Sequence, residues 1–161
     1  MTIFEAQHIH FTGIKGVAMT SLAQCVVDMG GTVVSGSDVG DKFVTQPILD
    51  TLQIHLFEGF SAENIAEDIE LLIYTAAHKG PDNPEVIAAR EKGIATLSQA
   101  EALSQLFNQK QGIAVCGVGG KSTVSAMLSW IFPKEQKPIS YSVGVGEIIL
   151  IDDGSTDGTL E

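Results

Sequence analysis

Short apolar runs alternate along this chain with segments of helical periodicity, and this alternation limits the possible folds more than any other feature. Strands are expected at residues 9–12, 32–35, 54–57, 70–74, 94–97 and 113–116. The Leu-Leu-Ile-Tyr run within residues 70–74 is apolar enough to be buried on both faces of a sheet. Strands separated by helices form parallel sheets with right-handed crossovers. We therefore expect an α/β fold with a Rossmann-like, doubly wound parallel sheet.

Capping residues mark where several helices begin and end. The first helix follows Gly13 and ends at Gly30-Gly31, because glycine commonly terminates helices. Asn83-Pro84-Glu85 starts another helix with a side-chain cap, a proline in the first turn and an acid at the positive helix end. Ser98 and Glu101 form a capping box for the next helix. The other expected elements are helices at residues 44–52 and 121–132 and a turn at 36–38.

The composition is that of an acidic globular protein. Of the 161 residues, 44% are hydrophobic and 18% are charged, which allows a buried core. The net charge of −11 repels phosphate backbones, so we expect no nucleic-acid partner and no membrane binding. Cys25 and Cys116 are too few for a disulfide framework, and the first residues lack the pattern of a signal peptide. We expect a cytoplasmic protein.

The first loop with chemical meaning is Gly13-Ile14-Lys15-Gly16-Val17-Ala18-Met19, directly after the first strand. A tight strand-to-helix turn presents backbone N–H groups at the positive helix end, where a diphosphate binds readily. The dinucleotide fingerprint Gly-x-Gly-x-x-Gly has lysine and alanine here at its second and third glycine positions. Phosphate binding and a purely structural turn are therefore both open. Asp38 either accepts hydrogen bonds from a ribose or base edge, or caps its own backbone.

The second loop is Gly117-Val118-Gly119-Gly120-Lys121-Ser122-Thr123, between another strand and helix. Gly-Lys-Ser is typical of a phosphate loop, in which backbone amides surround the anion, lysine reaches the terminal phosphates and serine binds magnesium. The spacing is shorter than the eight-residue consensus, whose first glycine falls at Val115. The alternative is a glycine-rich domain junction whose lysine is merely solvated.

Together, the elements and loops indicate one domain and part of a second. Five strands complete a doubly wound domain by about residue 110. Residues 111–161 open a second unit but are too few for a complete α/β layer. We expect a Rossmann-like domain at residues 1–110 and a partial P-loop α/β domain at 111–161, with a poorly specified tail after Lys134.

The motifs of the two loops resemble the Mur ligase family. Residues 10–19 are similar to that family's H-F-x-G-I-x-G-x-x-M loop, and Ser35-Gly36-Ser37-Asp38 to its S-G-S-D sequence. Asn83-Pro84-Glu85 also matches. The family's ATP loop, G-T-x-G-K-[ST]-T, has the short spacing of residues 117–123, although Val118 replaces its threonine. The resemblance covers about residues 8–131, with the motifs in the family's order.

This resemblance implies an ATP-dependent, ADP-forming carboxylate–amine ligase of peptidoglycan biosynthesis, of which the chain carries the amino-terminal part. In the alanine-adding branch, which the motifs match best, ATP and Mg²⁺ activate the carboxylate of UDP-N-acetylmuramate as an acyl phosphate. The amine of L-alanine then attacks this acyl phosphate. A further domain, which this chain lacks, presents the amino acid or peptide amine, so we expect the chain alone to be inactive.

The resemblance also assigns roles to individual residues. The residues implied to bind the UDP-sugar are Gly13, Ile14, Lys15, Gly16, Val17, Ala18, Met19, Ser37, Asp38, Thr75, Ala76 and Ala77. Those implied to bind ATP are Gly117, Val118, Gly119, Gly120, Lys121, Ser122 and Thr123. Lys121 is the expected catalytic residue on the phosphates, and Ser122 the expected magnesium ligand.

Three other interpretations stay open on the sequence alone. One is the related ligase that recycles murein tripeptide. Another is a fragment of an NAD-dependent oxidoreductase that uses the first loop and Asp38. The third is a non-catalytic module that binds a UDP-sugar. Outside the loops, His10 is more typical of a core histidine, Trp130 of a packing residue, and the acids of residues 63–70 of a solvated helix face.

Overall fold

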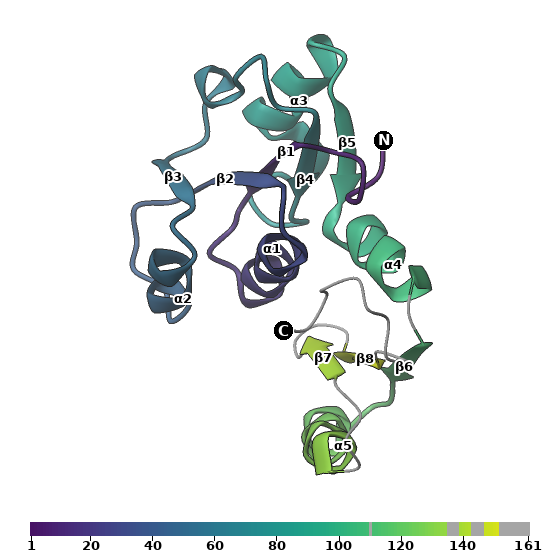
Figure 1. Ribbon diagram of the computed structural model, residues 1–161. Coiled ribbons are helices and arrows are strands. Elements are labelled where there is room, and N and C mark those ends of the chain that lie inside the picture. The colour runs from purple at the N-terminus through teal and green to yellow at the C-terminus, as the bar shows by residue number, and fades with distance from the viewer. Residues whose placement is uncertain (110, 135–138, 143–146, 152–161) are drawn as a thin grey trace. The chain divides into compact units, whose positions relative to one another are not determined.

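The computed structural model describes the backbone of residues 1–109, 111–134, 139–142 and 147–151, shown in Figure 1. Side chains are described for residues 1–109, 112–132 and 134. By its internal contacts the chain separates into two compact units, Met1–Leu103 and Ser104–Glu161. Each unit is described by itself below.

The first unit is built on a five-stranded sheet in the order β3-β2-β1-β4-β5, and every neighbouring pair is parallel. Its strands are β1 (His8–Thr12), β2 (Val33–Asp38), β3 (His55–Glu58), β4 (Leu71–Tyr74) and β5 (Ala95–Ser98). The order reverses at β1, since the chain adds β2 and β3 on one side and β4 and β5 on the other. This confirms the expected doubly wound α/β sheet.

Helices connect these strands. They are α1 (Val17–Met29), α2 (Gln46–Thr51), α3 (Pro84–Glu91) and α4 (Gln99–Gln109), with single 3₁₀ turns η1 (Ala62–Asn64) and η2 (Gly80–Asp82). Figure 1 shows α1 and α2 on one side of the sheet and α3 on the other. The expected caps are confirmed: Asn83 accepts from the Glu85 N–H at 3.0 Å, and Ser98 and Glu101 form a reciprocal capping box.

Strand β2 is longer than the sequence predicted. The turn expected at residues 36–38 is wrong, because these residues are strand: Gly36 and Ser37 pair with both β1 and β3, and Asp38 pairs with Glu58 of β3. The strand therefore carries Ser37 and Asp38 to the same sheet edge at which β1 ends.

The acids of residues 63–70 do not form a helix face, because only Ala62–Asn64 makes a single 3₁₀ turn. Two of these acids bind strand β1 or the residue before it. The Asp68 carboxylate lies 2.9 Å from His8 Nδ1, and the Glu70 carboxylate accepts from the Gln7 N–H at 2.7 Å. These two acids therefore support β1, although Asp68 is exposed to solvent as expected.

The two faces of β1 differ sharply in polarity. Alternation places Ile9 and Phe11, both fully buried, on one face, and His8, His10 and Thr12 on the other. The polar face is the one that α3 covers: His10 aligns with Leu72, and Leu72 packs in a hydrophobic cluster with Val86 and Ala89 of α3. A polar row thus lies inside an otherwise apolar layer.

The second unit contains β6 (Gln111–Val115), α5 (Lys121–Lys134), β7 (Ile139–Ser142) and β8 (Glu147–Ile151). Its sheet has the order β6-β8-β7, and both pairs are antiparallel. Helix α5 lies along one face of this sheet in Figure 1 and ends two residues beyond the expected Phe132. The tail after Lys134, expected to be poorly specified, supplies two strands, while residues 152–161 lie outside the described part.

Trp130 on α5 does not pack in a core. Its side chain is 67% exposed, and Lys134 Nζ lies 4.2 Å from the centre of its ring. In the described residues, no helix is long and apolar enough to cross a membrane.

Gly36→Ala is expected to lower the free energy of unfolding of the first unit by about 1–3 kcal/mol. A Cβ at Gly36 meets Ile14 side-chain carbons at 2.7 and 3.0 Å, and Ile14 is fully buried. Chemical denaturation measures the change. Gly119→Ala is the control, because a Cβ there meets nothing within 4 Å. Equal stability of Gly36→Ala and the unaltered chain contradicts this packing.

Candidate functional site

The carboxyl ends of four parallel strands meet at one edge of the first sheet. The loop after β1, Gly13–Gly16, lies there with Asp38 at the end of β2, Phe60 after β3 and the segment Thr75–His78 after β4. Ligands of doubly wound sheets bind at this edge, beside the strand at which the order reverses. The fold therefore brings the first predicted loop and the other predicted UDP-sugar residues to one place.

Strand β2 binds the first two amides of the glycine loop. The N–H groups of Gly13 and Ile14 both donate to the Ser37 carbonyl, at 2.9 and 3.1 Å. Gly13 has φ +82°, and an added Cβ there lies 2.4 Å from the Thr75 methyl carbon. Glycine is required for the turn and for the close approach of Thr75.

Asp38 binds the third amide of the loop. Its buried carboxylate accepts from the Lys15 N–H at 2.7 Å and from the Val39 N–H at 2.8 Å. The Lys15 side chain turns away from the loop opening, because its ammonium donates to the carbonyls of Val39 and Asp41 at 2.7 and 2.9 Å. Lys15 and Asp38 therefore join the loop to the chain after β2.

The open donors of this loop are those of the α1 helix end. Gly16 is the helix N-cap and has no side-chain cap, so the first-turn N–H groups of Val17 and Ala18 have no partner within the helix. Among the described residues no other acceptor is recorded for them. Met19, in contrast, is 2% exposed and packs in the core. The open backbone donors of the loop are therefore concentrated in one helical turn, where the helix end is positive.

His78 is a candidate site residue that sequence reasoning missed. Its Nε2 lies 3.6 Å from Asp38 Oδ1, and its ring packs on Phe60 with centroids 4.8 Å apart. His78 and Lys79 have positive φ values of 52° and 73°, a left-handed conformation that is uncommon for non-glycine residues. The histidine directly after Thr75-Ala76-Ala77 was the available signal.

An open pocket of ≈ 600 Å³ lies beside the loop, at the ends of β2 and β3 and next to α2. Phe43 and Phe57 contribute apolar walls, while Lys42 and Glu58 contribute charges. Lys15 lines it as well, with its ammonium 5.9 Å from the centre of the Phe43 ring. Asp50 adds a further charge, so the pocket combines apolar walls with several charged groups of both signs.

Glu85 is a second residue whose role the sequence did not reveal. The Asn83-Pro84-Glu85 motif predicted a helix-end acid, yet the side chain is fully buried. Its carboxylate accepts from the hydroxyls of Thr12 at 2.7 Å and Ser37 at 2.5 Å, which makes Ser37 an internal partner. Burial by itself raises the pKa of Glu85, but the close approach and charge of His10 and the hydrogen bonds from Ser37 and Asn64 outweigh it and lower that pKa.

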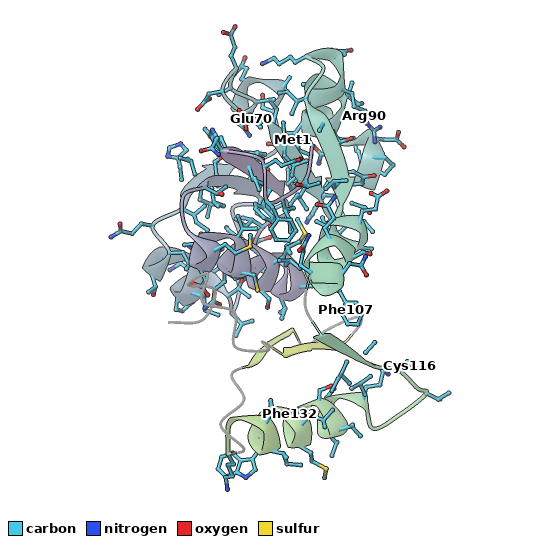
Figure 2. All side chains as sticks on the ribbon, turned by 45° about the vertical axis from the view of Figure 1, so that its right-hand side comes forward. Met1, Glu70, Arg90, Phe107, Cys116 and Phe132 are labelled. Carbon is cyan, nitrogen blue, oxygen red and sulfur yellow. The ribbon has the colours of Figure 1, made fainter. Side chains whose placement is uncertain are left out.

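The second predicted loop, residues 117–123, joins β6 to α5 in the other unit. Gly117 and Gly120 have φ values of +152° and +76°, and residues 116–120 are exposed. Lys121 Nζ donates to the Gly117 carbonyl at 3.0 Å, so the lysine folds across the loop. Cys116, labelled in Figure 2, is the exposed residue just before it.

This loop fits the phosphates of a nucleotide. A Cβ at Gly119 or Gly120 meets nothing within 4 Å, so the loop's backbone is open to a ligand. Lys121 and Ser122 begin α5, which places an ammonium and a hydroxyl at a positive helix end. Among the described residues, no group of three or more His, Cys, Asp or Glu side chains is placed to hold a metal ion.

The comparisons with known proteins concern this arrangement of strands and loops. Residues 8–111 match the family described as Mur ligase family, catalytic domain, which is more than half of the chain. The chain belongs to the Mur ligase family.

Curated relatives of this Mur ligase chain include three UDP-N-acetylmuramate–L-alanine ligases. The protein of Acetivibrio thermocellus is 37% identical over 95% of this chain and 32% of its own length. The protein of Agathobacter rectalis is 42% identical over 85% of this chain and 29% of its own length. The protein of Desulfitobacterium hafniense is 40% identical over 75% of this chain and 26% of its own length. The chain thus spans between a quarter and a third of the length of these relatives.

Solved structures of two family branches are similar to this Mur ligase chain. UDP-N-acetylmuramate–alanine ligase of Thermotoga maritima matches with a TM-score of 0.75 and 27% identity, over 96% of this chain and 34% of that one. A murein peptide ligase of Psychrobacter arcticus matches with a TM-score of 0.70 and 30% identity, over 81% of this chain and 27% of that one. The expected family membership and fold class are therefore confirmed.

Asp38→Asn is expected to lower the free energy of unfolding of this Mur ligase unit by about 1–3 kcal/mol. An amide side chain has one acceptor oxygen, so either the Lys15 or the Val39 N–H loses its acceptor in a buried position. Denaturation measures the loss, and hydrogen exchange of the two amides locates it. Asp28→Asn, at an exposed position of α1, should change stability by less than about 0.5 kcal/mol. Unchanged exchange at Lys15 and Val39 contradicts the role given to Asp38.

Proposed function

We propose that this chain is the amino-terminal part of a UDP-N-acetylmuramate–L-alanine ligase, an ATP-dependent, ADP-forming enzyme of cytoplasmic peptidoglycan biosynthesis. The observation that carries the proposal is the uncapped end of α1 at the switch point of the sheet, next to an open pocket. The similarity to L-alanine ligases along most of the chain supports the same assignment. The sugar nucleotide is the substrate that the first unit would bind.

For the UDP-sugar we propose the residues of the first loop, Gly13–Met19, with Ser37, Asp38 and Thr75–Ala77. The amides of Val17 and Ala18 are the donors suited to the diphosphate. Gly13, Ile14, Lys15, Ser37 and Asp38 hold the loop in shape through the bonds described above.

The nearby pocket supports a position for the uridine end of the substrate. Phe43 and Phe57 offer apolar surface for a base, and Lys42 adds a local cation to a chain of net charge −11. Thr75, Ala76 and Ala77 border the other side of the loop.

For ATP and Mg²⁺ we propose residues 117–123, within a partial P-loop domain at residues 111–161 that follows a Rossmann-like domain at 1–110. Lys121 would hold the terminal phosphates as the catalytic residue, and Ser122 would bind magnesium. Bound ATP supplies the phosphoryl group that activates the sugar's carboxylate. The exposed loop at the start of α5 supports this assignment. The amino acid or peptide amine would be bound by a further domain, so we expect binding without turnover from residues 1–161.

A murein peptide ligase is the second candidate, supported by the similarity of the chain to two solved structures of that branch. Structures of that branch match the chain with TM-scores of 0.68 and 0.70 at 28% and 30% identity. The curated L-alanine ligases are 33–42% identical. Both branches would use the same two loops, so the difference between them concerns the amine alone. Family membership gives no support to an NAD-dependent oxidoreductase.

Isothermal titration of the chain is expected to show binding of UDP-N-acetylmuramate in preference to UDP-glucose and NAD. Val17→Pro should weaken this binding about tenfold, because it removes one N–H that would face the diphosphate. Proline is tolerated at the first helical position, and Gly16 has the extended backbone that proline requires of its predecessor. Val17→Ala keeps the N–H and should bind normally. Absence of a preference for the muramate compound removes the proposed substrate.

Lys121→Ala is expected to weaken binding of Mg–ATP at least about tenfold, because it removes a charged donor to the phosphates. Binding of the UDP-sugar should stay unchanged, since the two loops belong to different units. Lys134→Ala, on the same helix, is the matched control for charge. Equal ATP affinity of the Lys121 variant and the unaltered chain contradicts the second loop's role.

A further inference from the structure

A row of polar side chains lies on the face of the first sheet that α3 covers. His8, His10 and Thr12 alternate along β1, and the register places Ser35 beside His10 and Ser37 beside Thr12. His10, Thr12 and Ser37 are each at most 1% exposed. Buried polar groups persist when they have partners, so the hydrogen bonds of this row need to be followed one by one.

A continuous chain of contacts runs from the protein surface to Glu85. Asp68 Oδ2 lies 2.9 Å from His8 Nδ1, and His8 Nε2 lies 2.9 Å from Ser35 Oγ. Ser35 Oγ lies 2.9 Å from His10 Nδ1, and His10 Nε2 lies 3.5 Å from Glu85 Oε2. The Asp68 side chain is 73% exposed and that of Glu85 is 0% exposed, so only one end meets water.

The hydrogens that the neutral side chains can place between these contacting atoms are one too few. Each of the three 2.9 Å contacts needs one hydrogen between its heavy atoms, and the buried 3.5 Å approach of His10 Nε2 to Glu85 Oε2, which is not a recorded hydrogen bond, is attractive only if it holds a fourth. Two neutral imidazoles and one hydroxyl supply three, because a neutral histidine carries a single N–H and a serine a single O–H. With both carboxylates ionised, a bare ring nitrogen then faces an oxygen lone pair at one contact. His10 Nε2 is the atom recorded as buried without a hydrogen-bond partner, although it points at Glu85.

The other partners of Glu85 indicate where a fourth hydrogen resides. Oε2 accepts from the hydroxyls of Thr12 and Ser37, and Oε1 accepts from Asn64 Nδ2 at 2.7 Å. A carboxylate with three donors is stabilised in its ionised form, and the lowered pKa of Glu85 agrees. The additional proton therefore belongs to the imidazoles.

Glu85 supports the glycine loop through two of these donors. Thr12 directly precedes Gly13, and the Ser37 carbonyl accepts the N–H groups of Gly13 and Ile14. The carboxylate thus joins the ends of β1 and β2 directly below the loop. Removing its charge would loosen the Thr12 and Ser37 side chains together.

We propose that His8 and His10 share one additional proton across Ser35, and that this proton holds the ionised Glu85 in place as a positioning residue for the sugar-nucleotide loop. In one arrangement both ring nitrogens of His8 carry a hydrogen, and the Ser35 hydroxyl donates to His10 Nδ1. In the other, both ring nitrogens of His10 carry a hydrogen, and the Ser35 hydroxyl donates to His8 Nε2. The proton enters at the exposed Asp68 end. The binding part rests on the proposed function, whereas the shared proton does not.

The groups that face the contacts between Asp68 and Glu85 come from several elements. Glu85 is faced by His10 and Thr12 of β1, Ser37 of β2 and Asn64 of η1. The His10 ring also lies 6.1 Å from the Phe57 ring of β3. Asp68 is the charged partner recorded for His8 in the described residues, and Glu70 accepts the neighbouring Gln7 N–H.

The test is nitrogen NMR of the histidine rings in the full chain at pH 7, with no ligand added. The expected spectrum shows one proton in excess of two neutral rings, distributed over His8 and His10. Glu85→Gln should remove it and leave His10 as the Nδ1–H tautomer, because the introduced side-chain amide can donate to Nε2. Glu70→Gln is the matched control and should leave both rings unchanged. Two neutral rings in the unaltered chain, or a protonated Glu85 in its carbon spectrum, overturn the proposal.

A second variant covers the case in which Glu85→Gln does not fold. Asp68→Asn changes an exposed side chain, so folding should be retained. It removes the charge at the surface end, and the shared proton should move towards His10. Unchanged signals of both rings in this variant show that the histidines are uncoupled, which overturns the proposal.

Binding is measured separately on the folded variants. Glu85→Gln should weaken the binding of UDP-N-acetylmuramate about tenfold, which is the loss expected for one hydrogen bond to a charged group. The binding of Mg–ATP should stay unchanged. Unchanged UDP-sugar affinity with the NMR shift present overturns the positioning role. If the unaltered chain binds no UDP-sugar, the proposed function fails, and the NMR result still decides on the shared proton.

Discussion

The end of strand β2 determines the shape of the first glycine loop. The Ser37 carbonyl accepts two amides of that loop and the Asp38 carboxylate accepts a third. These bonds exist because β2 pairs with β1 as far as Ser37 and continues to Asp38. With residues 13–15 bound internally, the N–H groups at the start of α1 are left to meet a ligand. The anion site therefore depends on a parallel strand pairing rather than on the loop alone.

An acidic chain can bind anionic ligands in this way because local dipoles act over shorter distances than net charge. The chain has a net charge of −11, but solvent and salt screen charges that lie more than about 10 Å from the ligand. The positive end of α1 and Lys42 lie at the proposed site itself. Asp38 binds an amide of the loop itself, and Glu85 lies below the loop, where three hydrogen-bond donors and His10 balance its charge. A buried carboxylate thus supports the loop without opposing an anion above it.

The two loops proposed to bind phosphates in this Mur ligase chain are held in different ways. In the first, bonds to a neighbouring strand leave part of one helical turn open. In the second, residues 117–120 are exposed and the lysine that begins α5 lies across the opening. The first loop departs from the generic dinucleotide fingerprint and the second lacks the generic phosphate-loop spacing, yet both resemble motifs of the family, apart from Val118 in the second. Their order along the chain makes the family recognisable from the amino-acid sequence.

The sequence by itself determined the order of strands and helices, the Asn83 and Ser98 caps, the two glycine loops and the family, because these depend on residues close together in the chain. It misjudged residues 36–38, since strand pairing overrode their turn preference. Only the tertiary structure decided that Glu85 binds Thr12, 73 residues earlier, and that His78 meets Asp38. The alternation of His8 and His10 shows that they share a face but not what covers it. That depends on where α3 packs, and packing between distant segments leaves no local pattern to read.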